Sequence, residues 1–212
     1  MAKRNQAAKR EFSDRDYSQH YQLKKAGIER VLGPMHDMVG HAIIPFQVGG
    51  PVDMYRFPKA KEGTAFVTME LIEPDGSGPQ PSRIGTYELV AFTKHRIDDS
   101  DSKNRFGETE LRIRSIFTSV ARYSYHAVLN PLETCEVPVG EDEPSQCLVF
   151  DEWKKRGIDF RIGQKKHGLL LCIEVFRSEM EFAMRHGAKA LLERLKEKEY
   201  YPYSDLERLP VA

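Results

Sequence analysis

The feature that most constrains the fold is a run of apolar residues near the carboxyl end, GLLLCIEVF over residues 168–176, interrupted only by Glu174. A strand with one face in water alternates apolar and polar side chains, whereas this run is nearly continuous. It is also far shorter than the ~20 residues that span a bilayer. We therefore predict a central β-strand that is covered on both faces.

A helix is expected directly after this strand. Ser178-Glu179-Met180-Glu181 has the pattern of a capping box, in which Ser178 accepts from the first turn and Glu181 reaches back. Apolar and small residues then follow at helical spacing on one stripe: Met180, Ala183, Met184, Gly187, Ala188, Leu191, Leu192 and Leu195. Gly187 inside this stripe costs about 1 kcal/mol of helix propensity relative to Ala. Close approach to a neighbouring strand would explain it.

The remaining pattern predicts an α+β (mixed α/β) fold. Helices are expected over residues 17–32 and from about 108 to 128, where Asn130-Pro131 ends the second. Strands are expected over residues 52–57, 65–72, 84–94 and 146–150, and short connections favour an antiparallel meander. We expect a central, mostly antiparallel sheet packed by the long central helix and the C-terminal helix.

The chain divides into three parts. Residues 1–16 are charged and aperiodic, which predicts a flexible N-terminal arm. Residues 17–199 form the domain, and residues 200–212, with two prolines, form an extended C-terminal tail.

Composition narrows the class of function. The 32 Lys and Arg balance 32 Asp and Glu, which argues against a dedicated nucleic-acid binder, because phosphate binding depends on clustered positive charge. No apolar run is long enough to cross a membrane, and the polar N-terminus does not resemble a secretory signal. Three cysteines without a C-x-x-C pair are typical of a reduced, cytoplasmic protein.

Motifs for catalysis are not found. Gly49-Gly50-Pro51 lacks the context of a phosphate-binding loop and is better explained as a turn. No G-x-S-x-G is present. His36 and His41 lie five residues apart without an H-E-x-x-H pattern, so a structural or surface role is favoured over metal binding. We expect no cofactor, no metal and no enzymatic activity.

The acidic and thiol side chains also favour structural roles over catalytic ones. Cys147 and Cys172 lie in predicted strands, where a buried thiol behaves as a small hydrophobe. Cys135 is expected in a loop, where neighbouring acidic side chains would raise its pKa rather than activate it. Glu179 and Glu181 lie in the first turn of a helix, where carboxylates complement the helix dipole.

Tyr123, Tyr125 and His126 cluster at the end of the long central helix. Tyr and His are amphipathic and frequent in binding surfaces, although core packing would explain the same residues. The acidic segment Glu141, Asp142 and Glu143 follows in the chain, and opposite charge speeds the encounter with a basic partner. These six residues are the candidate surface for another protein.

Four segments, in this order, resemble the suppressor-of-fused domain family. They are VDMYRF after Gly49-Gly50-Pro51, TYELV at residues 86–90, the helix IRSIFTSVARYSYHAVLNPLE with its Ala121-Arg122-Tyr123 triplet, and GLLLCIEVFRSEMEFAMRHGAKALLERL. Together they span about residues 25–198. The resemblance rests on their order and spacing, since no single motif is diagnostic.

The resemblance implies a sheet-and-helix domain that binds other proteins and catalyses no reaction. Two-lobed animal members clamp a short peptide between their lobes, but this chain is similar to the amino-terminal lobe only. Residues 134–146 (TCEVPVGEDEPSQ) depart from the animal pattern where the binding loop would lie, so that ligand is not carried over. Single-domain members are bacterial, and the role that the resemblance suggests is an immunity protein that sequesters a toxin, such as a nuclease.

Two other classes of function stay open at this point. One is a hydrolase-like enzyme whose histidines and carboxylates converge only in the fold, which a deep pocket joining His36, His41 or His126 to two carboxylates would support. The other is a self-associating structural protein, which a large apolar two-fold interface would mark. The sequence leaves the oligomeric state undetermined.

Overall fold

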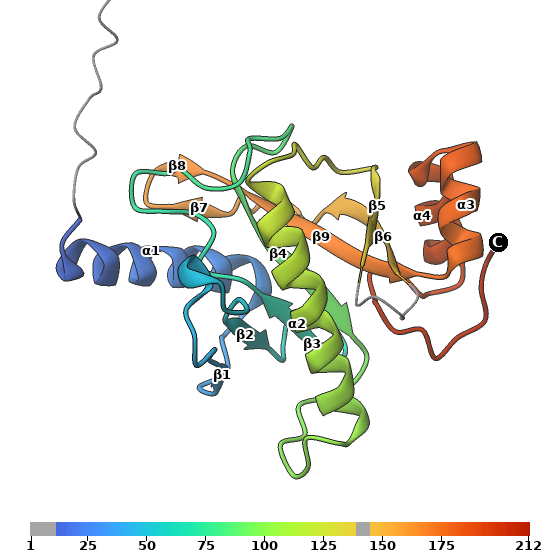
Figure 1. The fold of residues 1–212 in the computed structure, drawn as a ribbon, viewed down its shortest axis with the longest axis horizontal. Coiled ribbons are helices and arrows are strands. Elements are labelled where there is room, and N and C mark those ends of the chain that lie inside the picture. Colours follow the sequence, from blue (N-terminus) through green and yellow to red (C-terminus); the bar gives the residue numbers. More distant parts are fainter. Residues whose placement is uncertain (1–11, 139–144) are drawn as a thin grey trace, which may run out of the picture.

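The computed structural model describes residues 12–138 and 145–212, and its centre is a seven-stranded sheet with the order β1-β2-β3-β4-β9-β6-β5 (Figure 1). The strands are β1 (Val39–Gly40), β2 (Met54–Phe57), β3 (Thr64–Val67), β4 (Tyr87–Thr93), β5 (Thr134–Val137), β6 (Gln146–Glu152) and β9 (Gly168–Val175). A separate hairpin pairs β7 (Arg161–Ile162) with β8 (Lys165–Lys166). The helices are α1 (Asp14–Leu32), α2 (Arg105–Ser124), α3 (Arg177–His186) and α4 (Ala188–Glu197), with a 3-10 turn η1 (Phe46–Val48).

The predicted sheet is confirmed. Strands β2, β3 and β4 form an antiparallel meander, and β9, β6 and β5 continue the sheet with antiparallel pairs. The pair between β4 and β9 is parallel, in a register that places Leu89 opposite Leu170. Every residue of β4 and β9 is buried, as expected of central strands with packing on both faces.

The two helical layers lie on opposite faces of the sheet (Figure 1). One core is formed by α2 and the strand residues that face it, including Phe117, Leu89 and Leu170. The other core joins α1, α3 and α4 to the opposite face, including Ile28 and Leu191. The α+β architecture is therefore the expected one, with the long central helix and the C-terminal helices separated by the sheet.

The boundaries of several elements differ from expectation. Helix α2 begins and ends about three to four residues earlier than predicted, β2 and β4 begin two and three residues later, and β6 ends two residues later. Two further differences have local reasons. Helix α1 begins at Asp14, three residues earlier than predicted, because Ser13 and Asp16 form a capping box at its start. Strand β3 ends at Val67, five residues before the predicted end. The next residues turn away because the backbone N–H groups of Leu71 and Ile72 donate to the side chain of Glu88.

The C-terminal helix corrects two predictions. It is two helices, because Gly187 adopts φ 89° and ψ 142° and interrupts the helical backbone. Among the described residues other than its chain neighbours, none would come within 4 Å of a Cβ at this position, so close approach to a strand is not the reason for this glycine. Ser178 is not the cap either. The Glu179 carboxylate accepts from the N–H of Phe176 and closes the first turn.

The strands that were not predicted are β1, β5, β7 and β8, and Cys135 lies in β5 rather than in a loop. Residues beyond α4 run back along the molecule, where the Ser204 N–H donates to the carbonyl of Phe92 and Tyr203 is buried. None of the described helices is both long enough and apolar enough to cross a membrane.

Candidate protein-binding site

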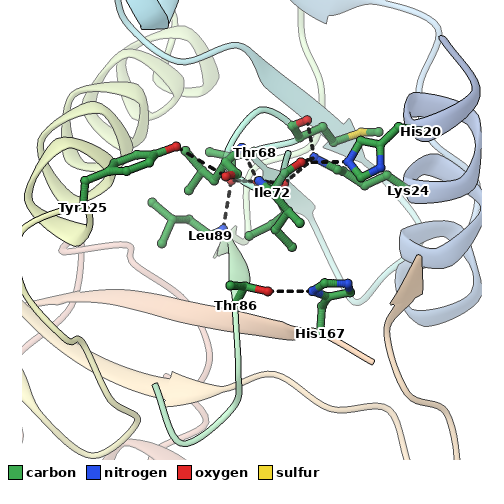
Figure 2. A network of polar contacts seen from close by, with 11 residues as sticks. His20, Lys24, Thr68, Ile72, Thr86, Leu89, Tyr125 and His167 are labelled. Carbon is green, nitrogen blue, oxygen red and sulfur yellow. Dashed lines mark hydrogen bonds and ion pairs between the residues drawn. The ribbon is translucent and has the colours of Figure 1, made fainter. Parts of the chain in front are cut away.

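The predicted aromatic cluster is split by the structure. Tyr123 is 52% exposed and lines a groove together with His126, which is also exposed. Tyr125 turns the other way, and its hydroxyl donates to the carbonyl of Leu71 at 3.3 Å (Figure 2). Burial raises the pKa of Tyr125 to about 12, so this hydroxyl stays a neutral donor. Two of the three residues therefore face a common surface, and the third anchors the end of α2.

The groove runs between the carboxyl-terminal half of α2 and strand β5 and has a volume of about 770 Å³. Its lining combines apolar and polar side chains. The apolar members include Val120, Leu129 and Val137, and the polar members include Arg122 and Glu133. Such a mixture suits the apolar core and polar rim of a protein interface.

Strand β5 is an open edge of the sheet. Among the described residues it pairs with β6 alone. On β6, Phe150 directs both its N–H and its carbonyl toward the β5 side, donating to Glu133 and accepting from Leu132. Because ladder bonds alternate along an antiparallel pair, the backbone groups of Thr134 and Glu136 point to the free edge. An open edge beside a groove is a template for another extended chain.

The side chains of β5 divide between the two faces of the sheet. Cys135 and Val137 pack toward α2 and contribute to the groove. Glu136 lies on the other face and forms an ion pair with Arg177 at the start of α3, which lowers the pKa of Glu136. Burial, reinforced by Glu136, raises the pKa of the Cys135 thiol, which agrees with the expected direction. The raised pKa makes this thiol a neutral contact in the groove.

The segment Glu141, Asp142 and Glu143 lies outside the described residues, so its predicted contribution to the surface stays a prediction. Among the described residues before it in the chain, Glu133 lines the groove and accepts from the N–H and side-chain amide of Asn130 at 2.9 Å each, while the Glu136 side chain binds Arg177 on the other face of the sheet.

A buried ion pair joins α1 to β4 and was not predicted. Lys24 and Glu88 are 1% and 0% exposed, and their charged atoms are 2.7 Å apart. The ammonium group also donates to the carbonyls of Met69 and Ile72, which uses all of its three protons. The Glu88 carboxylate accepts from the Thr68 hydroxyl as well as from two backbone N–H groups of the same loop.

This network holds the loop of residues 68–72 to which Tyr125 is bound (Figure 2). Because the donors and acceptors of the ion pair are engaged within the protein, the arrangement is suited to fixing the loop. A sequence signal for it exists. Lys24 precedes Ile28 by four residues and Val31 by seven, so a single charge lies on the buried stripe of α1.

The histidines considered for catalysis do not share a pocket. His36 lines a surface hollow with Lys61 and Arg96, while His126 lines the groove beside β5. His41 is 67% exposed and pairs with Asp53, at 2.7 Å between Nδ1 and Oδ2. Across residues 12–138 and 145–212, no group of three or more His, Cys, Asp or Glu side chains is arranged to hold a metal ion.

Comparison with known proteins gives one kind of match. No protein-family model matches the chain, and no curated protein matches it by sequence. A solved structure with a similar fold is the crystal structure of the Sufu–Fu complex, with a TM-score of 0.58 and 14% sequence identity over 91% of this chain and 92% of that chain. The chain therefore has a SUFU-like fold. At 14% identity the similarity is one of fold.

Proposed function

We propose that this chain is a non-enzymatic protein-binding module of the suppressor-of-fused type. The observation that carries the proposal is the groove of about 770 Å³ beside the open edge of β5. An extended segment of the partner would pair with the outward backbone groups of Thr134 and Glu136. Every second side chain of that segment would enter the groove, between β5 and Tyr123. The solved structure of similar fold is a complex with another protein, which supports the same class.

The nature of the partner is a finer part of the proposal. Glu133 lines the groove, and Glu141, Asp142 and Glu143 follow β5 in the chain, so a basic partner is favoured because opposite charges steer association. A nuclease toxin would meet this condition, with the chain as a bacterial immunity protein in the cytoplasm. The three free cysteines fit a reducing compartment.

The first experiment uses the purified chain as bait in its source lysate and identifies captured proteins by mass spectrometry. We expect a stoichiometric partner that is lost with Tyr123→Ala combined with His126→Ala. Tyr17→Ala is the matched control, because Tyr17 is 49% exposed on α1, far from the groove in the chain. Retention of the partner by the double variant would place its binding surface elsewhere.

A second variant tests the mode of binding. Glu136→Pro removes one outward N–H from β5 without removing a bond to β6, so we expect binding of the captured partner to weaken at least about tenfold. Glu136→Ala loses the same ion pair with Arg177 but keeps the N–H, and it serves as the control. Equal affinity of the two variants would contradict pairing along this edge.

A further inference from the structure

The loop between α1 and β2 has a composition unlike the rest of the chain. Across residues 38–52 the only ionisable side chain is His41, although charged residues make up 30% of the protein. Four large apolar side chains of this loop are exposed: Met38 by 52%, Ile43 by 101%, Ile44 by 55% and Val48 by 74%. We call residues 38–50 the apolar loop. Exposed apolar side chains gathered in this way are typical of a surface that is covered by another molecule.

The apolar loop is held in place at both ends. The Asp53 carboxylate accepts from His41 and from the Ala42 N–H, at 2.7 Å each. At the other end, Arg122 of α2 donates to the carbonyl of Gly49. The exposed side chains are therefore presented by a fixed backbone, which lowers the entropic cost of binding.

The apolar loop includes the second open edge of the sheet. Strand β1 lies at the opposite end of the strand order from β5, and in the part of the chain that the structure describes it pairs with β2 alone (Figure 1). An edge strand with a single partner strand and four exposed apolar side chains thus lie in the same loop.

We propose that this edge is the contact between two copies of the chain, joined by antiparallel pairing of their β1 strands and mutual burial of their apolar loops. A two-fold contact brings each surface against itself, so a patch without like charges is self-complementary, whereas a charged patch repels its own copy. The formal net charge of zero removes long-range repulsion between copies.

The exposed apolar area of the loop is also large enough to contribute to a stable dimer interface. The four exposed side chains offer a few hundred Å² of apolar area, a substantial part of the roughly 800 Å² per partner in a stable interface. Pairing of the β1 edges and contacts of the surrounding backbone supply the remainder. This inference does not depend on the function proposed for the groove.

Analytical ultracentrifugation of the full chain over a concentration series tests the proposal. We expect the mass to rise from 24.4 kDa toward twice that value, and Ile43→Asp combined with Val48→Asp to raise the dimer Kd by at least about tenfold. Met184→Asp is the control, because Met184 is 70% exposed on α3 and lies outside the apolar loop. A wild-type chain that is monomeric at every concentration overturns the proposal, as does a dimer that the double variant leaves intact.

A cross-linking readout keeps the test independent of any effect of the aspartates on folding. Met38→Cys is introduced with Cys135→Ser, which leaves only the buried Cys147 and Cys172 as native thiols. A short bismaleimide is expected to join two copies through residue 38. A wild-type dimer in which residue 38 does not cross-link would place the contact at another surface.

Discussion

Lys24 and Glu88 illustrate how single residues can set the position of a whole loop. Each is almost fully buried, and together they bind four residues of the segment 68–72. A charge that is buried with its partner is tolerated, whereas a charge that is buried alone is strongly destabilising. The loop is therefore fixed by electrostatics as well as by packing.

The first prediction concerns this pair. Lys24→Met leaves the Glu88 carboxylate buried without its counter-ion, and we expect the free energy of unfolding to fall by about 3–5 kcal/mol. Lys24→Met combined with Glu88→Gln removes both charges while keeping an acceptor for the loop. We therefore expect the double variant to lose less free energy of unfolding than the single variant. Urea unfolding measures both values. A double variant less stable than Lys24→Met would contradict the assignment.

A second prediction at the residue scale concerns pH. Burial lowers the pKa of His167 to about 4, and its Nδ1 lies 2.8 Å from the hydroxyl of Thr86. The unfolded chain binds a proton near pH 6.5 and the folded chain does not, so stability falls as pH drops from 6.5 toward 4. The full effect is of the order of 3 kcal/mol, because one pKa unit corresponds to about 1.4 kcal/mol.

Urea unfolding of wild type and His167→Gln between pH 7 and pH 5 measures this effect, since the difference between them cancels other titrating groups. The wild-type chain should lose more stability than the variant as pH falls. Parallel curves would show that His167 is not held neutral by burial.

At the scale of elements, a substitution at Gly187 tests whether residues 177–197 form one continuous helix or two helices, α3 and α4. If α3 and α4 were one continuous helix, Gly187→Ala would add about 1 kcal/mol of stability. With φ at 89°, Ala is strained, and we expect a loss of about 1 kcal/mol or more. The sign of the change in urea unfolding decides between them, and Gly157→Ala, at φ 76° in a loop, provides a control for strain without a helix.

The elements that were predicted correctly are those whose own residues settle their structure. The run at residues 168–176 and the apolar stripe of α2, with Ile113, Phe117 and Val120, carry a periodicity that few other structures satisfy. Strands β1, β5, β7 and β8 have two to four residues each, so their pairing depends on neighbours that are distant in sequence. The sequence pattern is helical on both sides of Gly187, and only the backbone angles of this glycine show that the helix is interrupted.

At the scale of the whole molecule, the two ends of one sheet carry the two proposed contacts. Strands β1 and β5 are separated by five strands in the sheet order, and Arg122 lies between the two surfaces, since it lines the groove and also donates to Gly49 of the apolar loop. None of the three substituted residues, Ile43, Val48 and Glu136, is bonded to Arg122. We therefore expect the two functions to be separable: Glu136→Pro should leave the sedimentation behaviour unchanged, and Ile43→Asp with Val48→Asp should leave partner capture unchanged. Coupled loss in either variant would show that the two surfaces form a single interface.

The amino-acid sequence by itself determined the central strand, the amphipathic helices and hence the α+β class, because burial of apolar periodicity is a local constraint. For Tyr123, Tyr125 and His126 it left a binding surface and core packing both open. The tertiary structure alone decided that Tyr125 turns away from that surface, that β5 is an open edge and that Lys24 meets Glu88. Those outcomes depend on which distant segments pack together, and 64 residues separate Lys24 from Glu88 in the chain. Short-range pattern carries no information over that separation.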